Sequence, residues 1–310
     1  MERGQQMNIK IEFYDVVIVG GGPAGLSAAL VLGRSKRKIL LIDENKPRHA
    51  VTAESHGFLT RDGIKPKEFK KIAKDQVSTY KNVKHKNDCV INVVKSEGFF
   101  ETETLKGAKY HSRKILFATG IIDQLPRIIG LSEVYGRSAF PCPYCDGWEV
   151  KDQPLAVIGN SERIFEYTRS VHNWSPNLIL FTNGSANLSL ENKRDLVRHN
   201  IKVKETKIKQ IISNNGMLKR IQLENGTIIS RAAAFIEGIK ETQSCKIPEK
   251  LGCKIDGNGA YITKQNGLSE VPGLYIIGDA KNLFSGLIKS ASEGYCAGVS
   301  INSEIIREDW

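Results

Sequence analysis

The sequence predicts an α/β protein with two three-layer domains, the second inserted into the first. Three observations carry this prediction. An apolar run at residues 14–19 enters a glycine-rich turn at residues 20–25, and helical periodicity follows to Gly33. A second strand, turn and helix begin at Leu155, later in the chain. Apolar runs at residues 110–117 and 274–277 each lead into small residues, and strands that alternate with helices in this way favour parallel sheets covered on both faces.

Composition places the chain among globular proteins of ordinary size. Its 310 residues are 40% hydrophobic, enough for two domains with separate cores. The formal net charge is +11, but no basic stripe interleaved with aromatic residues occurs, so we expect no nucleic-acid partner. No run of about eighteen apolar residues is present, and residues 1–13 lack the apolar core of a secretory signal. We therefore expect no membrane association and a cytoplasmic location.

The first glycine-rich turn has the spacing of a dinucleotide-binding motif. Gly20, Gly22 and Gly25 match G-x-G-x-x-G between a predicted strand and a predicted helix. The first glycine permits a tight turn, the second lets a pyrophosphate approach the backbone, and the third lets the helix pack on the strand. Asp43 ends the next strand at the distance where an acid binds the adenosine ribose, with Glu44 as its neighbouring candidate.

A pair of cysteines lies between the two glycine turns. Cys142 and Cys145 are separated by two residues and followed directly by Asp146. Such a pair can close a disulfide and carry two electrons by thiol exchange, and an adjacent acid can move the proton that each exchange requires. Zinc binding is the competing interpretation, but it needs two more ligands, and Cys245 and Cys253 are too far apart for a zinc knuckle.

Taken in order along the chain, these motifs resemble the low-molecular-weight thioredoxin reductase family. The resemblance covers nearly the whole chain, and its most specific part is the placement of Cys-Pro-Tyr-Cys-Asp-Gly. The motifs that carry it are Gly20-Gly22-Gly25, Ala118-Thr119-Gly120, Cys142-Pro143-Tyr144-Cys145-Asp146-Gly147 and Gly278-Asp279. The two dinucleotide-binding domains would therefore be Rossmann-like.

The resemblance implies an FAD-binding domain of residues 1–119 plus 246–310 and a pyridine-nucleotide-type domain of residues 120–245. It implies a homodimer and roles by position: Cys145 faces the isoalloxazine, Cys142 attacks the external disulfide, and Asp146 shuttles the proton. The resemblance also implies a set of cofactor-binding residues: Gly20, Gly22, Pro23, Ala24, Gly25, Asp43, Glu44, His56, Val90, Ala118, Thr119, Gly120, Gly278, Asp279, Leu287 and Ile288. For His56, a second proton carrier near the flavin and a structural histidine are both open, the structural role being favoured.

The chain departs from the family at the second nucleotide turn. Residues 159–164 read Gly-Asn-Ser-Glu-Arg-Ile, so side chains stand where the family has small residues. Residues 182–185, Thr-Asn-Gly-Ser, hold neither the basic cluster typical of NADPH binding nor an acid typical of NADH binding. Arg163 and Lys240 are candidates to compensate. Before the last helix, Ser285-Gly286 stands where the family has Arg-Gln, so the backbone near Leu287 would contact the flavin instead.

The predicted function is that of an FAD-dependent thiol-disulfide oxidoreductase. In the favoured direction, electrons pass from the flavin to Cys142/Cys145 and on to a thioredoxin-type protein or a small disulfide. The donor is open between NADPH, NADH and ferredoxin. One alternative is a dithiol oxidase that closes disulfides in small molecules with oxygen as acceptor. The other is a non-catalytic flavin-binding redox sensor, against which the intact dithiol argues.

Overall fold

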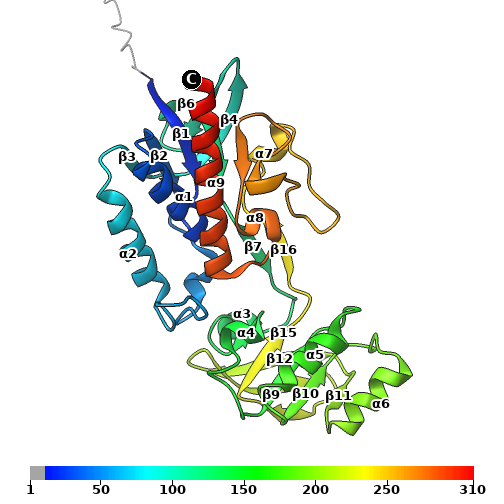
Figure 1. The fold of residues 1–310 in the computed structure, drawn as a ribbon. Helices are drawn as coiled ribbons and strands as arrows, with labels where there is room; N and C mark the ends of the chain where they lie inside the picture. The colour runs from blue at the N-terminus through cyan, green and yellow to red at the C-terminus, as the bar shows by residue number, and fades with distance from the viewer. Residues whose placement is uncertain (1–10) are drawn as a thin grey trace, which may run out of the picture. The chain divides into compact units, whose positions relative to one another are not determined.

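The computed structural model describes residues 11–310, and its contacts divide the chain into two compact units (Figure 1). The first unit contains the chain up to Arg48, Lys67–Ile122 and Thr242–Trp310. The second contains His49–Pro66 and Asp123–Glu241. The chain passes between the units along two short strands that pair with each other, β7 (Ile121–Gln124) and β16 (Lys240–Gln243). The second unit is thus inserted into the first, and residues 49–66 belong to it by their contacts.

The first unit is built on a seven-stranded sheet in which both chain ends take part. Strand β6 pairs in parallel with β1, near the N-terminus, and with β17, near the C-terminus. Strands β4 and β5 extend this sheet with antiparallel pairing. The elements of this unit are β1 (Glu12–Val19), α1 (Pro23–Arg34), β2 (Ile39–Asp43), α2 (Pro66–Ser78), β3 (Val83–Asn87), β4 (Val90–Ser96), β5 (Phe99–Thr104), β6 (Lys109–Phe117), α7 (Ile247–Lys250), η2 (Gln265–Gly267), β17 (Leu274–Ile276), α8 (Asp279–Asn282) and α9 (Gly286–Asp309).

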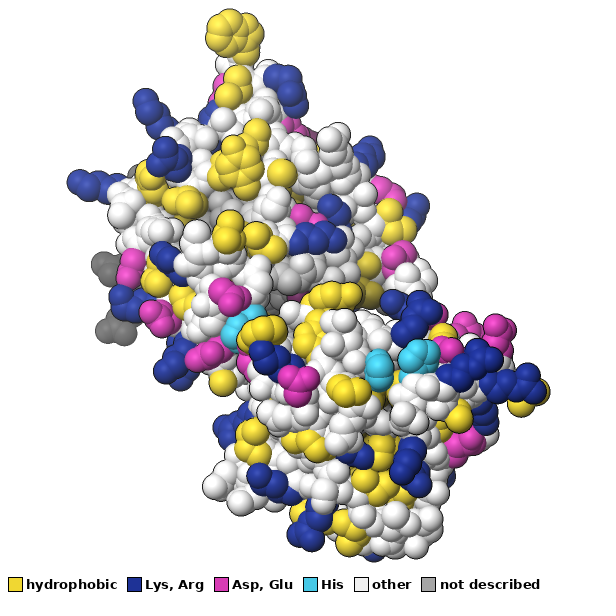
Figure 2. All heavy atoms as spheres, turned by 60° about the horizontal axis from the view of Figure 1, so that its bottom comes forward, with side chains coloured by type: hydrophobic (Ala, Val, Ile, Leu, Met, Phe, Trp, Pro, Cys, Tyr) yellow, Lys and Arg dark blue, Asp and Glu magenta, His cyan; other side chains and the backbone are white. Residues whose placement is uncertain are grey.

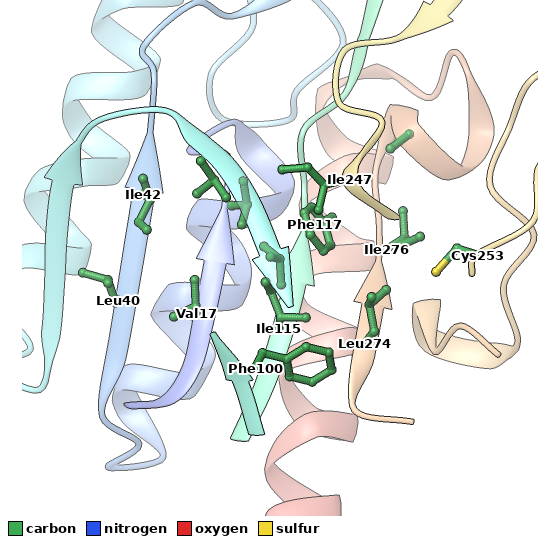
Figure 3. Packing of buried hydrophobic residues seen from close by; sticks show 14 of the residues in the cluster. Val17, Leu40, Ile42, Phe100, Ile115, Phe117, Ile247, Cys253, Leu274 and Ile276 are labelled. Carbon is green, nitrogen blue, oxygen red and sulfur yellow. The ribbon is translucent and has the colours of Figure 1, made fainter. Parts of the chain in front are cut away.

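Helices and loops bury both faces of this sheet, which is why its central strands are continuously apolar. On one face, Val17, Leu40, Phe117 and Ile276 pack with Ile247 and Cys253 (Figure 3). On the other, α1 packs against α9, and the contact is close because Gly294 lies on the backbone of α1. A Cβ at Gly294 would stand 2.1 Å from the carbonyl oxygen of Ala24. The C-terminal helix is therefore seated directly behind the first glycine turn.

The second unit repeats the parallel architecture on a smaller scale. Its five-stranded parallel sheet has the order β11-β10-β9-β15-β8, and a three-stranded antiparallel sheet of β12, β13 and β14 accompanies it. The elements are η1 (Arg48–Val51), α3 (Leu131–Val134), β8 (Ala139–Phe140), α4 (Pro143–Asp146), β9 (Leu155–Ile158), α5 (Ile164–His172), β10 (Leu178–Phe181), α6 (Leu190–Arg198), β11 (Lys202–Lys204), β12 (Ile208–Asn214), β13 (Met217–Leu223), β14 (Ile228–Ser230) and β15 (Ala233–Ile236).

The predicted α/β class is confirmed, with two parallel-sheet units of which the second is inserted into the first. Each predicted parallel strand is present within a few residues of its expected bounds. Residues 1–10 of the expected first domain lie outside the described residues. Within residues 11–310, no helix has the length and apolarity needed to cross a membrane. Lysine and arginine side chains are scattered over the face drawn in Figure 2 and form no single stripe.

Candidate active site

The first glycine turn joins β1 to α1 and has one crowded side and one open side. A Cβ at Gly20 would lie 2.4 Å from the carbonyl oxygen of Ala118, and a Cβ at Gly25 would lie 1.9 Å from that of Gly20. Gly20 also has a φ of +104°, which favours glycine. A Cβ at Gly22, in contrast, would meet no atom within 4 Å. The crowded side holds strand and helix together, and the open side leaves room for a ligand at the backbone.

Asp43 is the acid that this turn binds. Its side chain is buried and accepts a hydrogen bond from the Gly21 N–H at 3.1 Å, whereas Glu44 is exposed and pairs with Lys46. The Nζ of Lys70 lies 2.7 Å from Asp43 and that of Lys74 lies 3.5 Å away. Burial raises the pKa of Asp43, but Lys70 and the N–H groups of Asn45 and Gly21 together outweigh burial and hold this pKa below its usual value. Two lysines of α2 therefore turn toward a buried carboxylate and not toward solvent.

Residues from the middle and the end of the first unit meet at the same edge of the sheet. The Oγ1 of Thr119, after β6, is buried and has no hydrogen-bond partner among the described residues. Asp279, after β17, accepts hydrogen bonds from the N–H of Ser285 at 3.1 Å and from its Oγ at 2.8 Å, and it pairs with Arg48 at 3.3 Å. A Cβ at Gly278 would lie 3.2 Å from the Cβ of Ala24. The two chain ends thus assemble one site.

The other residues expected at this site lie in different surroundings. Leu287 and Ile288 lie in the first turn of α9, where the backbone N–H groups have no partner within the helix and can bind a ligand. The side chain of Val90 is buried in the same apolar cluster as Phe100. His56 is grouped with the second unit, where its Nε2 lies 3.5 Å from Glu149 and its Nδ1 lies 3.7 Å from Asp62.

The cysteine pair lies in the second unit, on the short helix α4. The two sulfur atoms are 2.6 Å apart, and both residues are partly buried. The hydrogen bond from Cys145, with backbone N–H groups of Cys145 and Tyr144, lowers the pKa of the Cys142 thiol below its usual value, although burial opposes this. The lowered pKa increases the fraction of Cys142 that is present as the nucleophilic thiolate at neutral pH.

Asp146 follows the pair in an environment that keeps its carboxyl group neutral. Burial, and next the charge of Glu149, raise its pKa to about 7, while His56 acts in the opposite direction. No lysine or arginine of the described residues pairs with it. A carboxyl group with this pKa can both give and take a proton near neutral pH.

The second nucleotide turn joins β9 to α5, and its residues differ from those of the first turn in that they form hydrogen bonds to side chains and loops of the protein. The N–H of Ser161 is 3.4 Å from a carboxylate oxygen of Glu237, and the Oγ of Ser161 donates to the other oxygen. Asn160 donates to the carbonyl of Ser185 at 2.6 Å and accepts from the N–H of Asn187 at 2.8 Å. The donors of Ser161 and the side chain of Asn160 are therefore bonded within the protein, and with the Glu237 carboxylate at the turn these residues do not fit a dinucleotide.

The comparisons with known proteins agree with one another. Residues 14–298 match the family of pyridine nucleotide-disulphide oxidoreductases. The chain belongs to this family. It is a thioredoxin reductase-like FAD oxidoreductase, as its resemblance to the low-molecular-weight reductases predicted.

Relatives support this placement over most of the chain. A protein of Arthroderma benhamiae named as a probable thioredoxin reductase is 31% identical over 87% of this chain and 74% of its own length. The solved structure of the protein from Bacillus anthracis that carries the name thioredoxin reductase TrxB is 39% identical, covers 96% of this chain and all of its own, and has a TM-score of 0.91. An oxidoreductase from Agrobacterium tumefaciens is 30% identical over 94% of this chain and 98% of its own, with a TM-score of 0.89.

The first site of this oxidoreductase fits FAD. The open face at Gly22, the unpartnered Thr119 hydroxyl and the carboxylates of Asp43 and Asp279 supply the backbone approach and the polar groups that a dinucleotide needs. When bound there, FAD supplies a two-electron carrier for the dithiol.

Sequence reasoning missed three charged residues of these sites. Lys70 binds Asp43, Arg48 binds Asp279, and Glu237 binds the second turn. Glu237 had a signal in the sequence, since an acid directly follows the apolar run Ala233–Ile236 at a strand end. Lys70 and Arg48 had none, because each comes from a segment distant in sequence from the carboxylate it binds.

Gly22→Ala tests the open face of the first turn. The φ of Gly22 is −79°, and the added methyl group meets no protein atom, so the free energy of unfolding of the apoprotein should change by less than about 0.5 kcal/mol. The methyl group should obstruct the pyrophosphate and raise the FAD dissociation constant at least about tenfold, measured by flavin fluorescence. Gly257→Ala, also in open space, is the control, and equal FAD affinity of the two variants would refute the assignment.

Asp146→Asn tests the raised pKa. In the unfolded chain the carboxyl ionises near 3.8, and in the folded protein near 7. Stability is therefore lost as the pH rises between these two values. A pKa raised by this amount lowers the free energy of unfolding by roughly 4 kcal/mol at most. The Asn variant should be no more stable than the parent near pH 4 and more stable above pH 7, measured by urea unfolding. Asp152→Asn, at an exposed site in the same unit, should show no such gain. A pH-independent difference would contradict the shift.

Proposed function

We propose that the enzyme passes two electrons between FAD and the Cys142/Cys145 pair, and from that pair to a thioredoxin-type protein or a small disulfide. The observation that carries this proposal is the 2.6 Å contact of the two sulfurs, next to the partly buried carboxyl group of Asp146, whose pKa is raised to about 7. Because the family is one of enzymes, this proposal is favoured over a non-catalytic flavin-binding sensor.

Each residue of the pair has a distinct role in the proposed exchange. The Cys142 thiolate attacks one sulfur of the substrate disulfide, and the other substrate sulfur leaves as a thiolate that takes a proton from Asp146. Cys145 then attacks the Cys142 sulfur of the mixed disulfide, which closes the internal disulfide and releases the second substrate thiol. The substrate disulfide is reduced and the enzyme dithiol is oxidised by the same two electrons.

Exposed aromatic side chains beside the pair supply a surface for the substrate. Tyr144 is 80% exposed and packs edge-on against Trp174 with ring centroids 5.2 Å apart. Trp148 is 68% exposed, with the Nζ of Lys151 3.0 Å from its ring centroid. Large apolar side chains exposed around a reactive pair favour contact with a partner, since aromatic residues are enriched where proteins bind.

The remaining assignments are part of the same proposal. The FAD domain would comprise residues 1–119 plus 246–310, and the dithiol domain residues 120–245, with crossings at β7 and β16, although the contacts of residues 49–66 group them with the second unit. The residues proposed to hold FAD are those of the first turn, Asp43, Thr119, Gly120, Gly278, Asp279 and the backbone of Leu287 and Ile288. A cytoplasmic location is supported by Cys89, Cys245, Cys253 and Cys296, which form no disulfide with any described residue.

A second candidate is a dithiol oxidase, which runs the exchange in reverse with oxygen as final acceptor. The closed turn around Ser161 favours this direction. If no nicotinamide dinucleotide binds there, the electrons must come from another donor, and in the oxidase that donor is the substrate dithiol. Ferredoxin as a protein donor would keep the reductase direction under the same constraint.

Serine substitutions test the dithiol. In the anaerobic holoenzyme, reduced thioredoxin or a small dithiol should bleach the flavin absorbance, and Cys142→Ser or Cys145→Ser should slow this by at least about a thousandfold. Cys296→Ser, at an exposed free thiol, should keep the parental rate. Bleaching that persists in both serine variants would exclude the pair as the route.

Admission of air to the reduced holoenzyme separates the two directions. Rapid reoxidation with peroxide formed in proportion to the dithiol added is expected of the oxidase. Slow reoxidation, with efficient transfer to a disulfide, is expected of the reductase.

The homodimer is proposed to use the outward face of α9. Ile288, Tyr295, Val299, Ile306 and Trp310 are exposed and recur at helical spacing, opposite the face that packs on α1. Val299→Glu should therefore shift the mass measured by light scattering from dimer to monomer. Val94→Glu, at a valine of similar exposure on β4, is the control, and a monomeric parent protein would refute the proposal.

A further inference from the structure

The two glycine turns of this chain stand in equivalent surroundings, which allows a direct comparison. In the first unit β1 pairs with β6, with Val19 opposite Phe117, so Ala118 lies beside Gly20. In the second unit β9 pairs with β15, with Ile158 opposite Ile236, so Glu237 lies beside Gly159. Where the first unit has a methyl group at this position, the second has a carboxylate.

The carboxylate of Glu237 takes the backbone and hydroxyl donors of the second turn. It accepts hydrogen bonds from both the N–H and the Oγ of Ser161. Two further N–H groups of the turn are also bonded, that of Arg163 to the Ser161 Oγ at 3.0 Å and that of Ile164 to the Ser161 carbonyl at 3.1 Å. A pyrophosphate at a strand-to-helix turn depends on such N–H groups.

Glu237 also fills the space next to the turn. A Cβ at Gly159 would lie 2.9 Å from the Cβ, the carbonyl oxygen and a carboxylate oxygen of Glu237. At the equivalent Gly20 the nearest atoms are backbone atoms of Ala118 and Thr119, so the carboxylate is what the second turn adds. Asn160 links the turn to the loop after β10 through Ser185 and Asn187, where the adenosine ribose would be read. The turn is closed by side chains of the protein itself.

The charge of Glu237 adds to the obstruction. No lysine or arginine of the described residues pairs with it, and the two cations considered for compensation, Arg163 and Lys240, are exposed and form no ion pair. A pyrophosphate would meet a like charge at close range, while the donors of Ser161, Arg163 and Ile164 are already bonded within the protein.

We propose that the Glu237 carboxylate is a built-in anion that occupies the pyrophosphate position of the second unit, and that it is the residue that makes this unit reject NADPH and NADH. The proposal concerns binding alone, so it holds for either direction of electron flow and stands apart from the proposed function. It predicts that the reductant of this enzyme is a dithiol or a protein electron carrier.

Calorimetric titration of the FAD-loaded protein with NADPH, and separately with NADH, tests this proposal. The parent protein should show no saturable binding up to about millimolar nucleotide. Glu237→Ala, which copies the alanine of the first unit, should bind at least one nucleotide at least about tenfold more tightly than the parent. Glu237→Gln removes the charge but keeps the volume and the bond from Ser161, so its gain should be smaller.

Glu162→Ala is the matched control, since it removes one exposed carboxylate from the same turn without touching Ser161. It should behave as the parent does. Circular dichroism and thermal unfolding establish whether each variant is folded. If Glu237→Ala does not fold, Glu237→Gln carries the test. Micromolar NADPH or NADH binding by the parent overturns the proposal, as does the absence of any gain in the folded Glu237 variants over Glu162→Ala.

Discussion

The backbone N–H groups at the end of a parallel strand are the constraint on which both units depend. A strand that enters a glycine turn before a helix leaves such groups without backbone partners, and something must bind them. In the first unit the open side of Gly22 leaves room for a ligand at the backbone, while Asp43 accepts a hydrogen bond from the Gly21 N–H. In the second unit Glu237 accepts hydrogen bonds from the N–H and the Oγ of Ser161. One architecture therefore yields a cofactor site in one unit and a closed turn in the other.

The dithiol depends on a different balance, between burial and nearby charge. Cys142 and Asp146 are both partly buried, yet their pKa values move in opposite senses. Cys142 gains hydrogen-bond donors that stabilise its thiolate, whereas Asp146 gains none and faces Glu149. A nucleophile with a lowered pKa next to an acid with a raised pKa suits thiol exchange near neutral pH, since one group must lose a proton and the other must supply one.

Much of the fold and part of the site could be predicted from the sequence, because they rest on local patterns. The central strands are continuously apolar and bounded by glycine, so their positions in the chain follow directly. The close approach that excludes a side chain at Gly25 was implied by its spacing from Gly20. Val90 was different, since a short apolar segment does not reveal whether it packs in a core or lines a ligand site, and here it packs in the core.

The sequence alone determined the α/β class, the insertion of one unit into the other, the family and the identity of the dithiol, because spacing along the chain dictates each of them. Only the tertiary structure decided which charges meet. Lys70 reaches Asp43 from α2, Arg48 reaches Asp279 from the far end of the chain, and Glu237 reaches Ser161 across a sheet edge. Such pairs form because packing brings distant segments within hydrogen-bond distance, and nothing in the order of the residues records that distance.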